Sequence, residues 1–486
     1  MPDAITKALS YWHKSFTRDP EGYSMVVSGE TIRLYTIASS QVLRNGELAD
    51  YHELTTLPGF AHRLRVKLAD LGYIVNIVDE RTPVPEPDVI AACKGLREYQ
   101  YECTYHALHS RGGVISCPTG WGKTHIIGAL IRGFAKEALK TRGTPSVLVV
   151  TPTLDISLKN YNDLVGILPE REVGLVNSTS KQFSDDVQVI TPESLGHVNL
   201  KDVGLLIYDE VHTVSMQRMT NLLDASHAIR YGMSATPSGR FDGGDLVIEG
   251  LFGPVVYSKS YGDAVKDGAI VPIKVYWVES PRPDTFHGYS TKNGCYRHAI
   301  WRNRDLHAIV AAVVSRVPAD VQVLCVVDKL EHMNFLCPYL PGITMVHAET
   351  NAKGLASSRY ANLQALSRND RKRIYAQVAS GEAKRVLSTG VYRTGVNFPD
   401  LQVLVNCEGM GSQIIAGQLP GRASRVAGGK NMGYIVDFWH SWDMVEKHGR
   451  QTPGMLLRDD RSREQVYTSL GFDQEWVTDI SKLAFE

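Results

Sequence analysis

The sequence lacks the marks of membrane, secreted and metal-stapled proteins. No apolar run approaches the ~20 residues needed to cross a bilayer, and the opening MPDAITKALSYWHKSF has no apolar signal-peptide core. The seven cysteines are odd in number and include no CxxC pair, which suits reduced thiols better than a disulfide framework or a zinc site. These absences predict a cytoplasmic protein with no membrane partner and no metal cluster.

The sequence also lacks an excess of charge of either sign. Lys plus Arg and Asp plus Glu both number 52, so bulk charge gives no sign of nucleic-acid binding, and any basic groove has to be local. Two stretches are candidates for such a groove, with a solvated helix face as the equal alternative. They are Arg297, His298, Arg302 and Arg304, and Arg368, Arg371, Lys372 and Arg373.

What the sequence does contain is a glycine-rich string, PTGWGKT, at 118–124. Glycines at 120 and 122 let backbone amides approach phosphate oxygens, while Lys123 supplies a charge and Thr124 a hydroxyl for magnesium. A plain Gly-rich turn is the alternative, and six fixed positions make it improbable by chance. The string predicts a site for ATP with Mg²⁺.

Short, apolar, β-branched runs follow this string. Segments 147–153, 187–192 and 203–210 read as buried parallel strands, whereas 124–140, before the first run, and 154–168, after it, read as helices. Such alternation predicts a doubly wound sheet, here a first motor domain over 91–262. In these sheets ligands lie beyond the carboxyl ends of the strands, where GWGKT and DEVH (209–212) both fall.

A second alternating set predicts a second α/β domain over 263–440. It has no phosphate loop of its own, but its polar loops include STGVYRTGVN and QLPGRASR, which are expected to face the nucleotide of the first domain. Its predicted strands are 321–328, 343–350, 383–390, 401–408 and 432–438.

The two ends of the chain carry smaller parts. Residues 1–90 mix strand-like and helix-like segments, which predicts a small α/β accessory domain. A separate hypothesis about its function is that it binds duplex DNA. It ends at the linker 81–88, where three prolines disfavour helix and strand. Residues 441–486 are expected to form a helical extension, with helices around MVEKHG and RSREQVYTSLGF.

Two pairs of charged residues are candidates for catalysis. Asp209 and Glu210 at a strand end would have separate roles: one would hold magnesium, and the other would orient or deprotonate the attacking water. Arg422 and Arg425 lie three apart, so on a helix they would share a face and reach a transition-state phosphate together. The alternatives are a helix cap for the acids and a surface pair for the arginines.

The chain resembles superfamily 2 helicases over about residues 91–440. PTGWGKT, DEVH, SATP (234–237) and QLPGRASR (418–425) match motifs I, II, III and VI of that superfamily in order. Within it, RNRDLHAIV, VHAET and the tail RSREQVY resemble the phage UvsW-type fork-remodelling enzymes, while the DEVH wording is shared with XPB-type proteins. The resemblance implies two tandem RecA-like parallel-sheet domains, and a host cytoplasmic location if the protein is phage-encoded.

The resemblance also implies a role for each matching residue. Gln100 would read adenine with Arg97 nearby, and Lys123, Asp209, Glu210, Arg422 and Arg425 would carry hydrolysis. Further nucleotide contacts would come from Gly120, Gly122, Lys123, Thr124, Gly395 and Asn397, with Thr124 and Asp209 holding Mg²⁺. Hydrolysis would be coupled to strand grip by His212, Ser234, Thr236 and Gln418. Nucleic-acid phosphates would be contacted by Thr153, Thr191 and Thr389.

The leading hypothesis is therefore an ATP-dependent DNA helicase or translocase that remodels branched DNA, such as forks, Holliday junctions, D-loops or R-loops. The partner would be branched or partly single-stranded DNA bound without sequence preference, and a monomer is the working expectation. The alternatives are an RNA helicase and a non-unwinding DNA-dependent ATPase switch. Trp121 and His347 are expected to be a loop anchor and a packed residue rather than base-stacking or catalytic groups.

Overall fold

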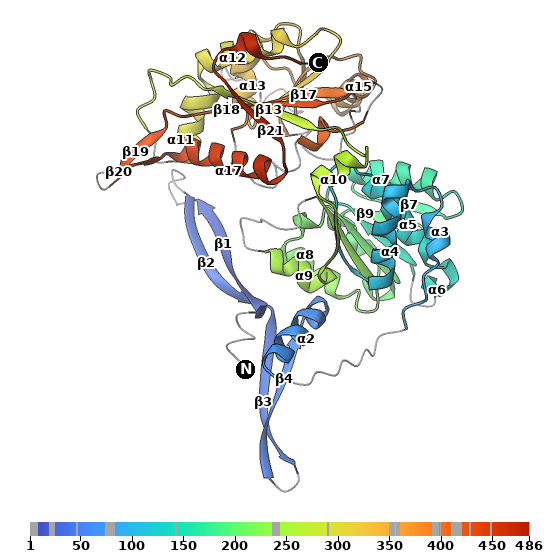
Figure 1. Cartoon of the computed structure of the whole chain (residues 1–486). Coiled ribbons are helices and arrows are strands. Elements are labelled where there is room, and N and C mark those ends of the chain that lie inside the picture. The colour runs from blue at the N-terminus through green and yellow to red at the C-terminus, as the bar shows by residue number, and fades with distance from the viewer. Residues whose placement is uncertain are drawn as a thin grey trace. The chain divides into compact units, whose positions relative to one another are not determined.

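The computed structural model describes most of the chain (Figure 1). The described residues are 8–18, 25–44, 47–72, 83–140, 144–235, 244–288, 291–348, 355, 360–390, 398, 400–409, 420–426, 429–447 and 450–485. The main boundary between two compact units falls between Lys259 and Ser260. Within the described part of the chain, no helix has both the length and the apolar character needed to span a membrane.

The N-terminal segment consists mainly of strands. Two of them form one two-stranded sheet, two more form an antiparallel hairpin, and a short helix follows. In chain order these elements are β1 (Ser10–Arg18), β2 (Met25–Arg33), β3 (Tyr35–Arg44), β4 (Glu47–Thr56), η1 (Pro58–Phe60) and α2 (Ala61–Asp70).

Two kinds of contact attach this segment to the first motor domain. The ring of Phe60 is fully buried beside Gly250, and the Nε atom of Arg63 donates a hydrogen bond of 2.7 Å to Glu249. Farther along, residues 83–88 form neither helix nor strand, as their prolines predict, and Asp88 then caps the next helix by accepting from the N–H of Ala91.

The first motor domain is built on an eight-stranded sheet with the order β12-β5-β11-β10-β6-β9-β7-β8. All neighbouring strands are parallel except β7 and β8. The strands are β5 (Gly113–Ser116), β6 (Val147–Val150), β7 (Val173–Val176), β8 (Lys181–Gln182), β9 (Val187–Ile190), β10 (Leu205–Asp209), β11 (Ile229–Ser234) and β12 (Val255–Ser258).

Helices cover both faces of this sheet. Figure 1 shows α4, α5 and α7 on one side and α8 and α9 on the other. Every residue of β6, β9 and β10 is buried, which explains why their sequences are continuous apolar runs. The helices are α3 (Val89–Cys93), α4 (Tyr101–Ser110), α5 (Lys123–Gly133), α6 (Lys136–Lys140), α7 (Leu154–Ile167), α8 (Met216–Leu223) and α9 (Asp245–Phe252), with 3₁₀ turns η2 (Glu98–Gln100), η3 (Pro192–His197), η4 (Leu200–Asp202) and η5 (Val211–Thr213).

The second motor domain is built on a seven-stranded parallel sheet with the order β15-β16-β14-β17-β18-β13-β21. Five of its strands match the five predicted from the sequence, whereas β13 and β21 were not predicted. The strands are β13 (Ile273–Glu279), β14 (Gln322–Val326), β15 (Thr344–Val346), β16 (Arg385–Ser388), β17 (Leu401–Asn406), β18 (Gly433–Trp439) and β21 (Asp473–Val477).

Described helices separate β13 from β14, β14 from β15, β15 from β16 and β18 from β21 along the chain, as expected for a doubly wound sheet. The helices of this domain are α10 (Tyr261–Lys266), α11 (Lys292–Tyr296), α12 (Arg304–Arg316), α13 (Leu330–Leu336), α15 (Arg368–Ala379) and α17 (Met455–Ser469). The shorter turns are the π-helical η6 (Arg297–Trp301) and the 3₁₀ turns η7 (Cys337–Tyr339), η10 (Pro420–Arg422) and η11 (Ile480–Lys482).

The C-terminal tail is part of the second sheet as well as a helix. The expected helix at RSREQVYTSLGF is present within α17. The expected helix at MVEKHG is wrong, because Met444–Lys447 form β19 and pair with β20 (Arg450–Pro453). After α17 the chain adds β21 beside β13, so the tail completes the sheet.

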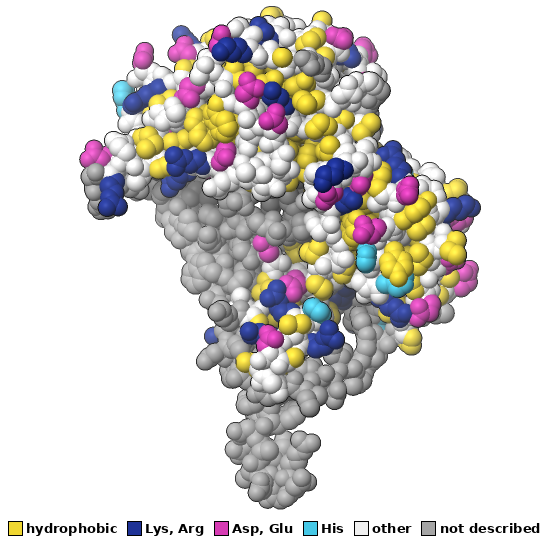
Figure 2. Space-filling view, viewed as in Figure 1, with side chains coloured by type: hydrophobic (Ala, Val, Ile, Leu, Met, Phe, Trp, Pro, Cys, Tyr) yellow, Lys and Arg dark blue, Asp and Glu magenta, His cyan; other side chains and the backbone are white. Residues whose placement is uncertain are grey.

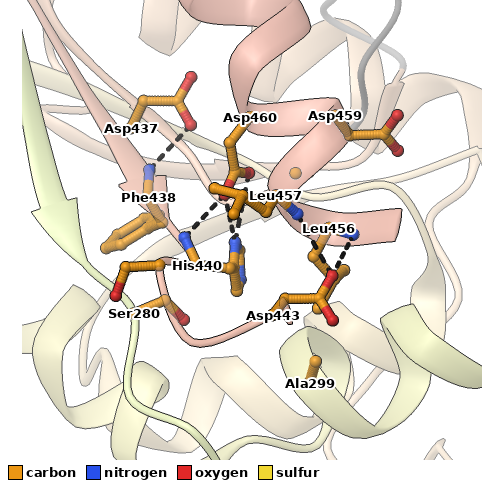
Figure 3. A network of polar contacts seen from close by, with 12 residues as sticks. Ser280, Ala299, Asp437, Phe438, His440, Asp443, Leu456, Leu457, Asp459 and Asp460 are labelled. Carbon is orange, nitrogen blue, oxygen red and sulfur yellow. Dashed lines mark hydrogen bonds and ion pairs between the residues drawn. The ribbon is translucent and has the colours of Figure 1, made fainter. Parts of the chain in front are cut away.

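A buried polar network joins α17 to the sheet (Figure 3). The Asp460 carboxylate accepts from the backbone N–H of His440 at 2.7 Å and lies 3.0 Å from its Nδ1. The guanidinium of Arg463, only 1% exposed, donates to Asp437 through Nε and Nη2 and to Asp460 through Nη2, each at 3.0 Å. Its Nη1 donates to the carbonyl of Gly409 at 2.7 Å. This network fixes the tail helix against the ends of β17 and β18.

Candidate functional site

Five neighbouring strands of the first sheet carry the predicted site residues at one edge. The strands β5, β11, β10, β6 and β9 are adjacent and parallel, so their carboxyl ends lie along the same edge. At or after their carboxyl ends, in that order, are Lys123, Ser234, Asp209, Thr153 and Thr191. The topology therefore gathers residues that are up to 111 positions apart, from Lys123 to Ser234, on one edge.

The loop between β5 and α5 has the backbone that its glycines predict. Gly120 and Gly122 have φ angles of +91° and +99°, which residues other than glycine rarely adopt. A Cβ atom at Gly122 would lie 2.5 Å from Nε2 of Gln100, so the position also lacks room for one. The N-terminus of the 11-residue helix α5 starts directly after this loop, and its amide groups favour an anion.

Lys123 lies between the phosphate loop and the acid pair. Its Nζ donates to the carbonyl of Cys117 at 3.4 Å and lies 3.8 Å from Oε1 of Glu210. The side chain is 11% exposed, so its charge is largely shielded from water. A phosphate in the loop would give this ammonium group a stronger partner than the carbonyl.

Asp209, at the end of β10, is a buried carboxylate. Its Oδ2 accepts from Nδ2 of Asn160 at 2.9 Å, and its Oδ1 accepts from the N–H of Glu210 at 3.0 Å. Burial, and then the neighbouring charge of Glu210, raise the pKa of Asp209, while Lys123 and Asn160 act in the opposite direction.

This environment fits a divalent cation held with Thr124. Carboxylate and hydroxyl oxygens are the donors that Mg²⁺ prefers, and a cation would offset the burial that disfavours the ionised form of Asp209. Among the described residues there is no cluster of three or more His, Cys, Asp or Glu side chains suited to a metal. Proteins usually hold Mg²⁺ through one or two carboxylates together with substrate phosphates, and Asp209 with Thr124 would suit such a site.

Glu210 is held in an unusual backbone conformation. Its φ of +52° is in the left-handed region, one of two such non-glycine residues in the described part of the chain. The N–H and Oγ1 of Thr213 both donate to its carbonyl, at 3.0 and 2.9 Å. Such strain costs about 1–3 kcal/mol and persists where surrounding structure holds it, often at functional sites.

His212 links the acid pair to the end of β11. Its Nδ1 lies 3.0 Å from Oγ of Ser234 and 3.5 Å from Oε2 of Glu210, and its side chain is buried. The structure thus brings together His212 and Ser234, the two described members of the predicted coupling set. Thr236 and Gln418, the other two members, lie outside the described residues.

Gln100 lies against the phosphate loop. Its Oε1 accepts from the N–H of Arg97 at 3.1 Å, and its Nε2 donates to the carbonyl of Gly122 at 3.4 Å. The side chain is buried, whereas Arg97 is exposed and donates to the hydroxyl of Tyr99. Contact with adenine stays a prediction for both residues.

The three predicted phosphate-binding threonines differ in exposure. Thr153 is exposed and caps α7, where its Oγ1 accepts from the N–H of Ile156 at 3.3 Å. Thr191 is 5% exposed and Thr389 8% exposed. The hydroxyl of Thr191 also bonds to Ser194 at 3.3 Å. Thr153 is therefore the most accessible of the three.

The two predicted finger arginines do not share a helix. Arg422 ends the 3₁₀ turn η10 and is 6% exposed, whereas Arg425 forms a β-bridge with Ile270. The expectation of one helical face is wrong, because Pro420 and Gly421 favour a tight turn over a helix interior. Gly395 and Asn397 of the predicted nucleotide contacts lie outside the described residues.

Three sequence predictions outside the main site concern packing and charge. Trp121 is fully buried and His347 is 1% exposed, as expected for a loop anchor and a packed residue. Of the first basic stretch, Arg297 and Arg302 both bind the buried Glu331, with their Nη2 atoms 3.1 and 2.6 Å from its oxygens. On the face drawn in Figure 2, basic and acidic side chains of the described residues are interspersed.

Sequence reasoning missed Asn160. It lies in the middle of α7, is 1% exposed, and binds the Asp209 carboxylate from 49 residues away. A single asparagine in an amphipathic helix gives no signal for such a contact.

The fold and this site define a class of protein, one with two tandem RecA-like domains and, on the first of them, a glycine-rich loop beside an acid pair. Residues 94–239 match the family described as type III restriction enzyme, res subunit. The DNA 3'-5' helicase XPB of Kineococcus radiotolerans is 24% identical over 348 residues, 68% of this chain and 58% of that protein. The ATP-dependent DNA helicase uvsW of Enterobacteria phage T4 is 20% identical over 371 residues, 72% and 68% of the two chains.

The predicted resemblance to superfamily 2 helicases, with similarity to UvsW-type and XPB-type members, is confirmed. Among solved structures, S. cerevisiae Dbp5 bound to RNA and ADP BeF3 has a TM-score of 0.51 at 13% identity, covering 79% of this chain and 94% of that one, which shows the shared fold. The chain spans about three fifths of the length of the first curated relatives that it matches, so a shared activity does not follow from the likeness alone.

Proposed function

We propose that the protein is an ATP-dependent DNA helicase or translocase that remodels branched DNA, such as forks, Holliday junctions, D-loops or R-loops. The proposal rests on the site and on two relatives whose names describe DNA helicases, one of them from a phage. Action in a host cytoplasm would accord with the phage relative.

One observation carries the ATPase part: a lysine at a phosphate loop with an acid pair beside it. Lys123 would bind the terminal phosphates, and Glu210, whose Oε1 is 3.8 Å from that ammonium, would orient or deprotonate the attacking water. Thr124 and Asp209 would hold Mg²⁺, which neutralises charge on the phosphates when bound. Arg422 and Arg425 would stabilise the charge that develops during hydrolysis.

The contact between His212 and Ser234 supports coupling to nucleic acid. A change at Glu210 on loss of the γ-phosphate would reach the end of β11 through these two side chains, which lie 3.0 Å apart. ATP binding and hydrolysis would then favour different conformations, each gripping the strand differently. Grip through backbone phosphates, with Thr153 the most accessible candidate, would carry no sequence preference.

A substrate panel tests the proposal. ATP hydrolysis and strand displacement would be measured with forks, four-way junctions, D-loops, R-loops, linear duplex DNA and RNA duplexes, with Lys123→Ala as the inactive control. We expect stimulation by DNA and faster processing of branched substrates than of linear duplex. A purified protein whose ATPase no DNA stimulates would contradict the proposal.

The same panel separates the two alternatives. Stimulation by RNA above matched DNA would indicate an RNA helicase. DNA-stimulated hydrolysis and fork binding without strand displacement would indicate a non-unwinding ATPase switch, in which residues 1–90 would be the first place to seek the DNA contact.

A further inference from the structure

The second motor domain contains a hollow that the predicted motifs do not include. It has a volume of about 720 Å³ and lies where the N-terminus of α12 meets α13 and η7. A volume of this size accommodates a small organic group. Its wall includes Arg302, Arg304, His307, Asn334, Phe335 and Tyr339.

The lining of this hollow is positively charged. Two arginines and no carboxylate are among its described lining residues. Glu331, nearby, is already bound by Arg297 and Arg302. Arg304 is exposed and is the first residue of the 13-residue helix α12, where backbone amides favour an anion. The hollow therefore suits a group with at least one negative charge.

The lining also offers flat aromatic faces. Phe335 is 37% exposed, and the guanidinium of Arg302 lies 5.4 Å from the centre of its ring. Tyr339 lines the same hollow and packs against His307 with ring centres 5.4 Å apart. Aromatic rings and guanidinium planes are the surfaces on which unpaired bases stack.

His307 places an unused acceptor at this site. It is 1% exposed, and one ring nitrogen bonds the carbonyl of Ile300, while Nε2 has no hydrogen-bond partner among the described residues. Burial lowers the pKa of His307 to about 4, so the ring is neutral near pH 7. A neutral ring that donates through its other nitrogen leaves Nε2 free to accept a hydrogen bond. Buried polar atoms are nearly always hydrogen-bonded, so a donor from a ligand would satisfy this nitrogen.

One wall of the hollow is fixed in advance. The backbone N–H of Asn362 donates to Oδ1 of Asn334 at 2.9 Å, and its Nδ2 donates to the carbonyl of Asn334 at 3.0 Å. These bonds hold residue 362 against α13, so a ligand would not have to order this wall.

We propose that this hollow binds one unpaired nucleotide of a DNA strand, with its base stacked on Phe335 and its phosphate at Arg304 and the N-terminus of α12. A single phosphodiester charge matches the exposed arginine, and a base matches the aromatic faces and the acceptor of His307. The inference rests on the proposed function, because it supplies that motor with a grip on a displaced or flapped strand.

Binding of labelled oligonucleotides to the full chain tests the proposal without requiring hydrolysis. The probes are a 20-nucleotide oligo(dT), a fork with single-stranded arms, and a blunt duplex, each titrated at several salt concentrations by fluorescence anisotropy. The variants are Phe335→Ala and Arg304→Ala. Exposed side chains elsewhere provide the matched controls Phe183→Ala, where the ring is 55% exposed, and Lys266→Ala, where the side chain is 79% exposed.

We expect Phe335→Ala to weaken binding of oligo(dT) and of the fork by about tenfold, as for loss of one base stack. Arg304→Ala should weaken both and lower the slope of log affinity against log salt by about one. Both variants should bind the blunt duplex as the wild type does, and both controls should leave every probe unaffected.

Two results would overturn the site. One is unchanged oligo(dT) affinity in both variants with thermal unfolding also unchanged. The other is an equal loss on the blunt duplex, which presents no unpaired base. A failure of the proposed function appears separately, as absent DNA-stimulated ATPase in the wild type whatever these affinities are.

Discussion

The two motor domains differ in the partner that each provides for an aspartate at or near a strand end. In the first domain, Asp209 is buried with a neutral amide, Asn160, as its direct side-chain partner, and its pKa is raised. In the second, Asp437 near the end of β18 is bound by two nitrogens of Arg463 at 3.0 Å. The proposed site would supply Asp209 with a cation only when Mg²⁺ and substrate bind, whereas Asp437 has a permanent cationic partner within the chain.

This contrast distinguishes the proposed catalytic role of Asp209 from the structural role of Asp437. A permanent partner at Asp209 would compete with Mg²⁺ and phosphate, whereas a missing partner at Asp437 would leave a buried charge uncompensated. A buried aspartate at or near a strand end would thus serve turnover in one domain, as proposed, and it attaches the tail helix in the other. Four variants test this contrast, in order of decreasing expected effect.

Lys123→Ala should reduce ATP hydrolysis by roughly a thousandfold or more, because it removes the charge that meets the phosphates. Steady-state phosphate release with saturating DNA measures it, and thermal unfolding checks that the variant folds. Normal turnover in a folded variant would contradict the assignment of this site.

Arg463→Met should lower the free energy of unfolding by about 3–5 kcal/mol, because Asp437 and Asp460 would lose a buried partner. Urea unfolding followed by tryptophan fluorescence measures this, since Trp277 is packed 5.8 Å from that guanidinium. Arg461→Met, an exposed change on the same helix, is the matched control. Equal stability of both variants would show that the network contributes little.

Arg425→Ala should reduce turnover by roughly a hundredfold while leaving the affinity for ATP nearly unchanged, as for a group that acts mainly in the transition state. Single-turnover rates and binding of a labelled ATP analogue separate the two quantities. Equal losses in both would instead indicate a structural arginine.

Asn160→Ala should have the smallest effect, a shift of the acidic limb of the ATPase pH profile to higher pH. The hydrogen bond from Asn160 lowers the pKa of Asp209, so its loss raises that pKa further. Acidification would then protonate the carboxylate at a higher pH than in the wild type, and activity would be lost earlier. An unchanged acidic limb would show that Asp209 does not set it.

The sequence allowed the two sheets and most of the site edge to be predicted, because both depend on local signals. Buried parallel strands are continuous apolar runs, and β6, β9 and β10 fell where those runs predicted them. The glycine-rich loop and the acid pair are short strings, and their residue types and spacing are enough to predict the site.

Features that depend on distant partners were missed. β21 is a largely exposed edge strand with the sequence DQEWV, so it has neither an apolar run nor strict alternation. Arg463 would be expected on a solvated helix face, since arginines are seldom fully buried, and its partner Asp437 is 26 residues away. Met444–Lys447 form a hairpin strand in which Met444 and Val445 are both more than 40% exposed, so the sequence shows neither the helical nor the strand periodicity that burial of one face would produce.

The placement of β21 has a consequence for synthesis on the ribosome. Its partner β13 is made about 200 residues earlier, with Lys274 opposite Asp473 in the register. The first motor domain has all its strands once residue 258 has emerged, and can fold while translation continues. The second must wait with an open sheet edge at β13 until the last strand arrives, so a chaperone that shields that edge would raise the yield of full-length protein more than that of the first domain alone.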